Sequence, residues 1–204
     1  MTSLTIETPH GPARAELHCA PEGGRAGLLI GHGAGGGVGA PDIVAASRAA
    51  AAAGVHVALV EQPYRVAGRR VPAPAHQLDT AWLTVVERLS AEWFHELPLV
   101  FGGRSSGSRV ACRTSADGQA VAVLCLAFPV HPPGKPDKTR MPELDAVTVP
   151  TLVVQGQSDA FGMPGPGRHR EIVVLPGDHS LKKDLPALTR AVEEWLDRIL
   201  RPLD

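Results

Sequence analysis

The sequence predicts an α/β protein with a mostly parallel sheet and helices on both faces. Two observations lead to this fold class: short apolar runs alternate with segments of helical periodicity, and each run is almost continuously apolar. A strand covered by helices on both faces has no polar side, so its sequence does not alternate. An N-terminal hairpin is expected from residues 4–8 and 14–19, which do alternate around a turn at residues 10–12. The buried strands are expected at residues 27–30, 55–60, 97–101, 121–128, 151–154 and 171–175.

The expected helices carry caps and apolar stripes. Asp42 is placed to cap an alanine-rich helix that ends at Gly54, and Asp184 begins the last helix. Residues 131–144 contain four prolines and are expected to form an irregular surface loop. Spacings of three and four residues predict two further buried stripes. Their members are Leu78, Trp82, Val85, Leu89 and Trp93 in one helix, and Leu188, Val192, Trp195 and Ile199 in the other.

Length, charge and cysteine content limit the classes of protein to consider. The 204 residues suit one domain, 1–204, without a large cap domain. A formal net charge of −1 does not indicate a nucleic acid or an anionic membrane as partner, and no stretch is typical of a signal peptide or membrane span. Three cysteines without paired spacing are typical of reduced thiols. We therefore expect a cytoplasmic protein with a small-molecule substrate, and the sequence leaves a homodimer open.

Residues 99–111 contain a Gly-x-Ser-x-Gly motif centred on Ser105, with an apolar run before it and a helix-like segment after it. A nucleophile at a sharp strand-to-helix turn needs strained backbone, and side chains two positions away would collide there. Gly103 and Gly107 fit this requirement. The following helix would direct its first N–H groups, beginning with Ser106, at a developing oxyanion. A glycine-rich turn without chemistry is the alternative, and the flanking strand and helix count against it.

A second glycine-rich segment, residues 29–37, follows an earlier strand and allows two interpretations. With Glu61 at the end of the next strand, it resembles the fingerprint of a dinucleotide-binding loop. However, the next helix is delayed until about Asp42, and that interpretation leaves Ser105 unexplained. We therefore favour an oxyanion loop in which Ala34 presents its backbone N–H. The glycines of the alternative dinucleotide fingerprint are Gly31, Gly33 and Gly36.

A serine hydroxyl is a weak nucleophile, so it needs a base that a carboxylate orients. Asp159 and His179 each lie in a loop just after an expected strand, and both follow the serine in the chain. They are therefore the expected acid and base. Asp178 and Asp145 are the alternative acids, while His169 precedes the last strand and lies at its wrong end. No pattern of metal ligands is present in the sequence, so neither a metal nor another cofactor is expected.

Five segments together resemble the α/β-hydrolase superfamily over nearly the whole chain. More narrowly, they are similar to its small dienelactone-hydrolase-like branch, among relatives of a testis-expressed α/β hydrolase and of a histone acetyltransferase complex subunit. The resemblance implies an α/β-hydrolase fold, a Ser105–Asp159–His179 triad and no cofactor. Dienelactone hydrolases proper use a cysteine nucleophile, which puts dienelactone as the substrate in doubt. The segments are residues 32–36, 102–110, 128–136, 155–159 and 178–180, of which 128–136 is the most specific.

These residues lead to the hypothesis of a serine hydrolase that cleaves a small ester, thioester or lactone through an acyl-enzyme. Ala34 and Ser106 are expected to form its oxyanion hole. A binding or scaffold protein on the same fold is the alternative, because fold alone does not decide function. Arg104 could bind a substrate carboxylate or form a salt bridge within the fold. The residues expected to bind substrate are His32, Tyr64, Arg104 and His131.

Overall fold

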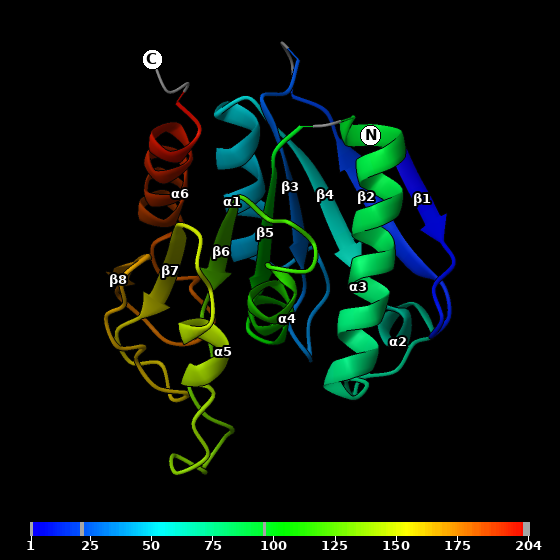
Figure 1. The fold of residues 1–204 in the computed structure, drawn as a ribbon. Coiled ribbons are helices and arrows are strands. Elements are labelled where there is room, and N and C mark those ends of the chain that lie inside the picture. Colours follow the sequence, from blue (N-terminus) through cyan, green and yellow to red (C-terminus); the bar gives the residue numbers. More distant parts are fainter. Residues whose placement is uncertain (1, 21–22, 96, 202–204) are drawn as a thin grey trace.

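The computed structural model describes residues 2–20, 23–95 and 97–201. Eight strands form one sheet in the order β1-β2-β4-β3-β5-β6-β7-β8 (Figure 1). β1 pairs antiparallel with β2, β2 pairs antiparallel with β4, and the other neighbours are parallel. The expected hairpin and mostly parallel sheet are therefore confirmed. The strands are β1 Thr2–Ile6, β2 Ala13–His18, β3 Ala26–Gly31, β4 Val55–Glu61, β5 Leu99–Arg104, β6 Ala122–Leu126, β7 Thr151–Gly156 and β8 Arg170–Leu175.

Helices cover both faces of this sheet. α1 and α6 pack together against one face, and α3, α4 and the short α5 pack against the other (Figure 1). A π-helical turn, Ser90–Phe94, extends α3. In the part of the chain that the structure describes, no helix is both long and apolar enough to cross a membrane. The helices are α1 Pro41–Ala52, α2 Pro63–Val66, α3 Ala75–Leu89, α4 Ser106–Thr114, α5 Met141–Asp145 and α6 Leu185–Ile199.

Of the two helix caps predicted from the sequence, one is confirmed and the other is wrong. The Asp184 carboxylate accepts a hydrogen bond from the Ala187 N–H at 3.0 Å, so the cap of α6 is confirmed. The cap expected at Asp42 is wrong, because Ala40 precedes the first turn of α1 and no side chain caps it. Asp42 lies inside that turn and is only 1% exposed. Tertiary contacts, described below, use its carboxylate instead.

Two further expectations need correction. Residues 131–144 were expected to be irregular throughout, but Met141–Asp145 forms α5, whose Leu144 is buried in the core. The last strand was expected to be buried on both faces. β8 is instead the edge of the sheet and pairs only with β7, so Val174 is 50% exposed. An edge strand reaches beyond the cover of the helices, which the apolar sequence does not reveal.

The topology brings four loops to one edge of the sheet. The parallel strands end at the lower edge in Figure 1, where the loops that follow β3, β5, β7 and β8 lie. Because β3 and β5 are neighbours, the glycine-rich segment after β3 lies beside the turn that ends β5. Residues 131–140 project from the same edge (Figure 1). In open α/β sheets, ligands bind at the carboxyl ends of the strands, so a functional site is expected at this edge.

We predict that Trp195→Ala lowers the free energy of unfolding by about 3–5 kcal/mol, because a large side chain leaves a cavity that the core fills only partly. Trp195 is 1% exposed and belongs to the core cluster between α6 and the sheet. Urea unfolding followed by circular dichroism measures the effect. Val174→Ala, at a half-exposed position, is the matched control, and equal losses in the two variants would contradict the packing described here.

Candidate active site

Ser105 occupies a strained turn between β5 and α4. Its backbone has φ 53° and ψ −109°, a conformation that side-chain-bearing residues rarely adopt. The Ser105 N–H donates a hydrogen bond to the Leu126 carbonyl at 2.8 Å, so the neighbouring strand β6 holds the turn in place. The hydroxyl is thereby presented at the start of a helix, as the motif predicted.

The two glycines of the motif leave no room for a side chain. A Cβ on Gly103 would overlap the backbone of Gly107, and a Cβ on Gly107 would come within 2.6 Å of the Gly31 carbonyl oxygen. The start of α4 therefore packs backbone to backbone against the end of β3. The steric argument made from the sequence is confirmed at both positions.

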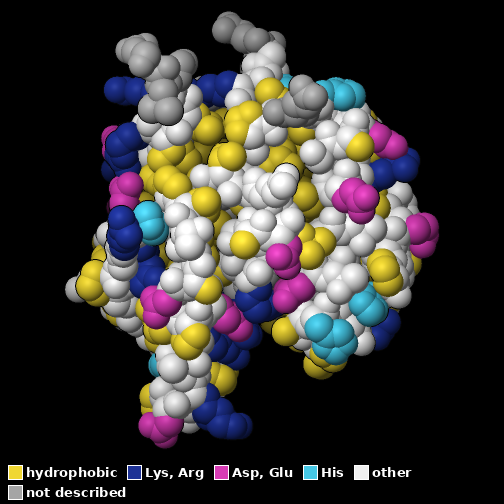
Figure 2. Space-filling model, in the orientation of Figure 1, with side chains coloured by type: hydrophobic (Ala, Val, Ile, Leu, Met, Phe, Trp, Pro, Cys, Tyr) yellow, Lys and Arg dark blue, Asp and Glu magenta, His cyan; other side chains and the backbone are white. Residues whose placement is uncertain are grey.

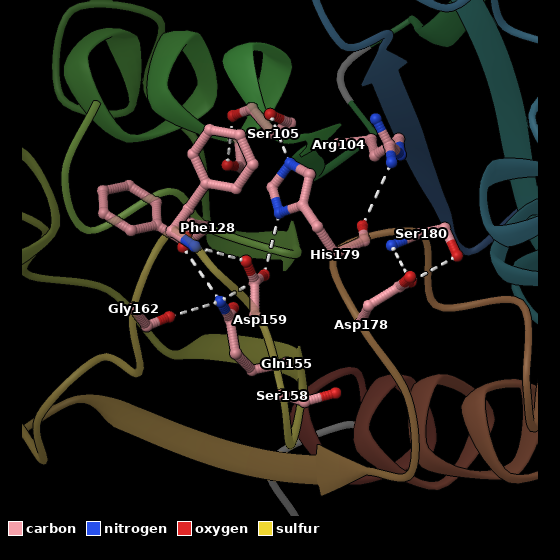
Figure 3. A network of polar contacts seen from close by, with 12 residues as sticks. Arg104, Ser105, Phe128, Gln155, Ser158, Asp159, Gly162, Asp178, His179 and Ser180 are labelled. Atoms are coloured by element: carbon pink, nitrogen blue, oxygen red, sulfur yellow. Dashed lines mark hydrogen bonds and ion pairs between the residues drawn. The ribbon is translucent and has the colours of Figure 1, made fainter. Parts of the chain in front are cut away.

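A hydrogen-bonded chain links Ser105 to His179 and Asp159 (Figure 3). The Ser105 Oγ lies 2.9 Å from Nε2 of His179, and Nδ1 of His179 lies 2.8 Å from Oδ2 of Asp159. An ionised carboxylate only accepts hydrogen bonds, so Nδ1 carries the ring proton and Nε2 can accept the serine proton. The loops after β5, β7 and β8 supply one residue each. This arrangement can activate a serine hydroxyl.

Asp159 is fixed by buried partners. Its side chain is completely buried. Oδ2 accepts a hydrogen bond from Nε2 of Gln155 at 2.8 Å, and Oδ1 accepts one from the Phe161 N–H at 2.8 Å. Gln155 is also fully buried, and its amide group lies within hydrogen-bonding distance of the Phe128 and Gly162 carbonyl oxygens (Figure 3). Gln155 therefore holds both the acid and the loop around it.

Sequence reasoning did not single out Gln155 or Phe161. Gln155 is a polar residue near the end of a buried apolar strand, which was the available signal. Phe161 lies against the His179 ring, with 4.2 Å between the ring centroids, and lines the cavity described below. No sequence pattern predicts this contact, because Phe161 lies in an irregular loop.

The alternative acids point elsewhere. The Asp178 carboxylate accepts hydrogen bonds from the N–H and hydroxyl of Ser180, at 2.9 and 2.6 Å, and these bonds lower its pKa (Figure 3). Asp145 pairs with Arg170 at 2.7 Å. His169 precedes β8 and lies at the opposite end of that strand from His179. Asp159 is therefore the carboxylate that reaches His179.

Arg104 ties the serine turn to the histidine loop. Its Nε donates to Oδ2 of Asp42 at 3.0 Å, and its Nη2 donates to the His179 carbonyl oxygen at 3.0 Å. Burial raises the pKa of the Asp42 carboxyl, and the nearby Arg104 guanidinium acts in the opposite direction. Of the two roles considered for Arg104, the structure shows the salt bridge within the fold.

The glycine-rich segment lies against the nucleophile. A Cβ placed on Gly33 would come within 3.5 Å of the Ser105 Cβ. Ala34 and Ser106 both line the cavity next to Ser105, as an oxyanion hole requires. α1 begins only at Pro41, so the last glycine of the alternative fingerprint does not open a helix, as dinucleotide binding would need.

Three of the residues expected to bind substrate do not reach this cavity. His32 is buried: its Nδ1 contacts the Gly33 carbonyl oxygen at 2.8 Å, and its Nε2 accepts the Gln62 N–H at 3.1 Å. Tyr64 lies beside the His32 ring, with 5.7 Å between centroids. Nδ1 of His131 lies 3.0 Å from the Pro132 carbonyl oxygen. Of the four residues expected to bind substrate, only Arg104 is among those that line the cavity.

A cavity of about 400 Å³ adjoins Ser105 and His179. The segment after β3, the first turns of α4, Phe161 and the projecting loop surround it. Figure 2 shows the surface hollowed beside that loop, with side chains of both charges around the hollow. The volume is within the range of sites that bind small molecules.

The fold and this arrangement of residues define an α/β hydrolase. Residues 24–185 match the family model of the alpha/beta hydrolase domain, and the chain belongs to this family. Membership supports a hydrolase in general terms.

Solved structures agree on the fold. An α/β serine hydrolase without a lid, from Xanthomonas campestris, is 21% identical with a TM-score of 0.79, over 97% of this chain and 94% of that one. Est1E from Butyrivibrio proteoclasticus is 18% identical with a TM-score of 0.79, over 98% and 99%. A dienelactone hydrolase from Anabaena variabilis is 16% identical with a TM-score of 0.76, over 98% of both chains. At these identities the likeness establishes the α/β-hydrolase fold.

Buried His32 makes stability depend on pH. Burial lowers the pKa of His32 from the ordinary 6.5, so the folded protein binds a proton there less readily than the unfolded chain. The contribution of neutral His32 to the free energy of unfolding is therefore fully present above pH 6.5 and is lost as the pH falls below that value.

We predict that the free energy of unfolding falls less steeply between pH 7 and about pH 5 in His32→Gln than in the unchanged protein. One such group contributes up to about 1.4 kcal/mol per pH unit. Urea unfolding at a series of pH values measures both slopes. Parallel curves would show that His32 is not the group responsible.

Proposed function

We propose that this protein is a serine hydrolase that cleaves a small ester, thioester or lactone through an acyl-enzyme. The hydrogen-bonded chain from Ser105 through His179 to Asp159, at the edge of a cavity, carries the proposal. The strained serine turn supports it, because such backbone is retained where function requires it.

In this mechanism His179 takes the proton from Ser105 as the serine oxygen attacks the substrate carbonyl. Asp159 keeps the ring proton on Nδ1 and stabilises the imidazolium that forms. The N–H groups of Ala34 and Ser106 receive the negative charge on the carbonyl oxygen. His179 then gives its proton to the leaving group, and it activates a water molecule that releases the acyl group from Ser105.

Within the family, we assign the chain to the dienelactone-hydrolase-like branch, near the testis-expressed and histone acetyltransferase complex relatives. The segment 128–136 supports this assignment, and serine at position 105 favours substrates other than dienelactone. The free thiols Cys19, Cys112 and Cys125 fit a cytoplasmic location. One structure of Est1E holds ferulic acid, so aromatic acyl esters belong in a first substrate screen.

We predict that Ser105→Ala lowers kcat by about 10⁴-fold or more with any ester that the protein accepts, because the covalent intermediate cannot form. A fluorophosphonate probe should label the unchanged protein and not the variant. Ser3→Ala, an exposed serine in β1, is the control and should keep both activity and labelling. Unchanged turnover in Ser105→Ala would refute the assignment, and a folded protein that resists the probe would favour the scaffold alternative.

We predict that Gln155→Leu lowers kcat by about 10²-fold with little change in KM, because small displacements of a catalytic group are costly. The substitution removes the amide that holds Asp159 and leaves the cavity lining intact. Steady-state kinetics provide the measurement, with Gln157→Leu, at an exposed position two residues further on, as the matched control. A change in KM alone would contradict the positioning role of Gln155.

A further inference from the structure

Four arginines line the cavity beside Ser105, and three of them are paired. Arg104 binds Asp42, as described above. Arg109 makes two hydrogen bonds to Glu143, at 2.7 and 2.6 Å, and Arg113 makes two to Asp79, at 2.8 and 2.6 Å. The fourth is Arg140.

Arg140 differs from the other three because it forms no ion pair within the described part of the chain. Its backbone is fixed, since its N–H donates to the Val130 carbonyl at 2.7 Å and it directly precedes α5. Its side chain is partly buried where the projecting loop meets the body of the protein. Burial lowers the pKa of Arg140, as do the nearby charges of Arg109 and Arg113, while the charge of Glu143 acts in the opposite direction. Arginine nevertheless stays charged in proteins, so a cation remains in this wall.

The pairing of charges indicates what would complement this wall. Asp42, Glu143 and Asp79 hold three of the arginines and Asp159 is bonded to His179, so none of these carboxylates forms an ion pair with Arg140. A guanidinium matches the planar fork of a carboxylate with two parallel hydrogen bonds. A single carboxylate of the substrate would supply the partner that Arg140 lacks within the described part of the chain.

We propose that Arg140 binds a carboxylate of the substrate, so that the ester cleaved at Ser105 carries a second, anionic acid group. This inference rests on the proposed function and names its substrate class. Arg109 and Arg113 hold their carboxylates from α4 and form the rigid frame of the subsite.

The test compares matched pairs of esters that differ only in charge. One pair carries the charge on the acyl side: the 4-nitrophenyl monoester of glutarate and its methyl-capped analogue. The other carries it on the alcohol side: the butyrate esters of 3-hydroxybenzoate and 3-hydroxybenzamide. In at least one pair, kcat/KM should favour the charged ester by about tenfold or more, the usual scale of a charge-assisted hydrogen bond. In Arg140→Gln that ratio should fall to about one, with the larger change in KM.

Lys138→Gln is the control, because Lys138 is an exposed cation on the same loop that does not line the cavity. It should keep the preference for the charged ester. Equal turnover of both esters in each pair, or a preference that survives Arg140→Gln, would overturn the inference and leave the proposed hydrolase standing.

A binding measurement separates this inference from the proposed function. Glutarate should raise the Tm of the Ser105→Ala protein and should not raise that of Ser105→Ala combined with Arg140→Gln. If no ester is cleaved but this difference is observed, the proposed function fails and the carboxylate site stands. Absence of both the charge preference and the Tm difference refutes the site.

Discussion

The close packing of two backbones at the turn of Ser105 is the constraint on which the candidate site depends. Gly107 lies against the end of β3 so tightly that a methyl group would meet the Gly31 carbonyl. This contact places the start of α4 and the segment after β3 on either side of the serine. Ala34 and Ser106 therefore line one cavity. A looser turn would move Ser105 away from Ala34 and Ser106.

Buried polar contacts connect the remaining parts to that turn. Arg104, the residue before the nucleophile, reaches both Asp42 in α1 and the backbone of His179. Gln155 reaches Asp159 from within β7. The loops that carry Ser105, Asp159 and His179 are thus joined by partly buried charged or amide groups, and such bonds are stronger than those at the surface. Preorganised groups of this kind need no rearrangement when charge develops in the transition state.

Prediction from the sequence succeeded where the signal was local or followed chain order. Apolar runs located the strands, and the elbow motif, Asp159 and His179 follow in the order that this fold requires. It failed for loop residues, because the sequence does not show whether such a side chain points into the cavity or away from it. His32 and His131 belong to segments that border the site, yet their rings point into backbone contacts. The direction of such a side chain depends on the conformation of its loop, and the residue type does not determine that conformation.

The sequence by itself determined the fold class, the strained serine turn and the candidate acid and base. Steric limits at glycines and the periodic spacing of apolar residues in buried elements involve only a few neighbouring residues. They can therefore be recognised in the sequence alone. Only the tertiary structure decided which charges pair. Arg104 lies 62 residues from Asp42, and Arg109 lies 34 residues from Glu143. Among the described residues Arg140 forms no ion pair, because long-range packing joins Asp42, Asp79 and Glu143 to the other three arginines of the cavity.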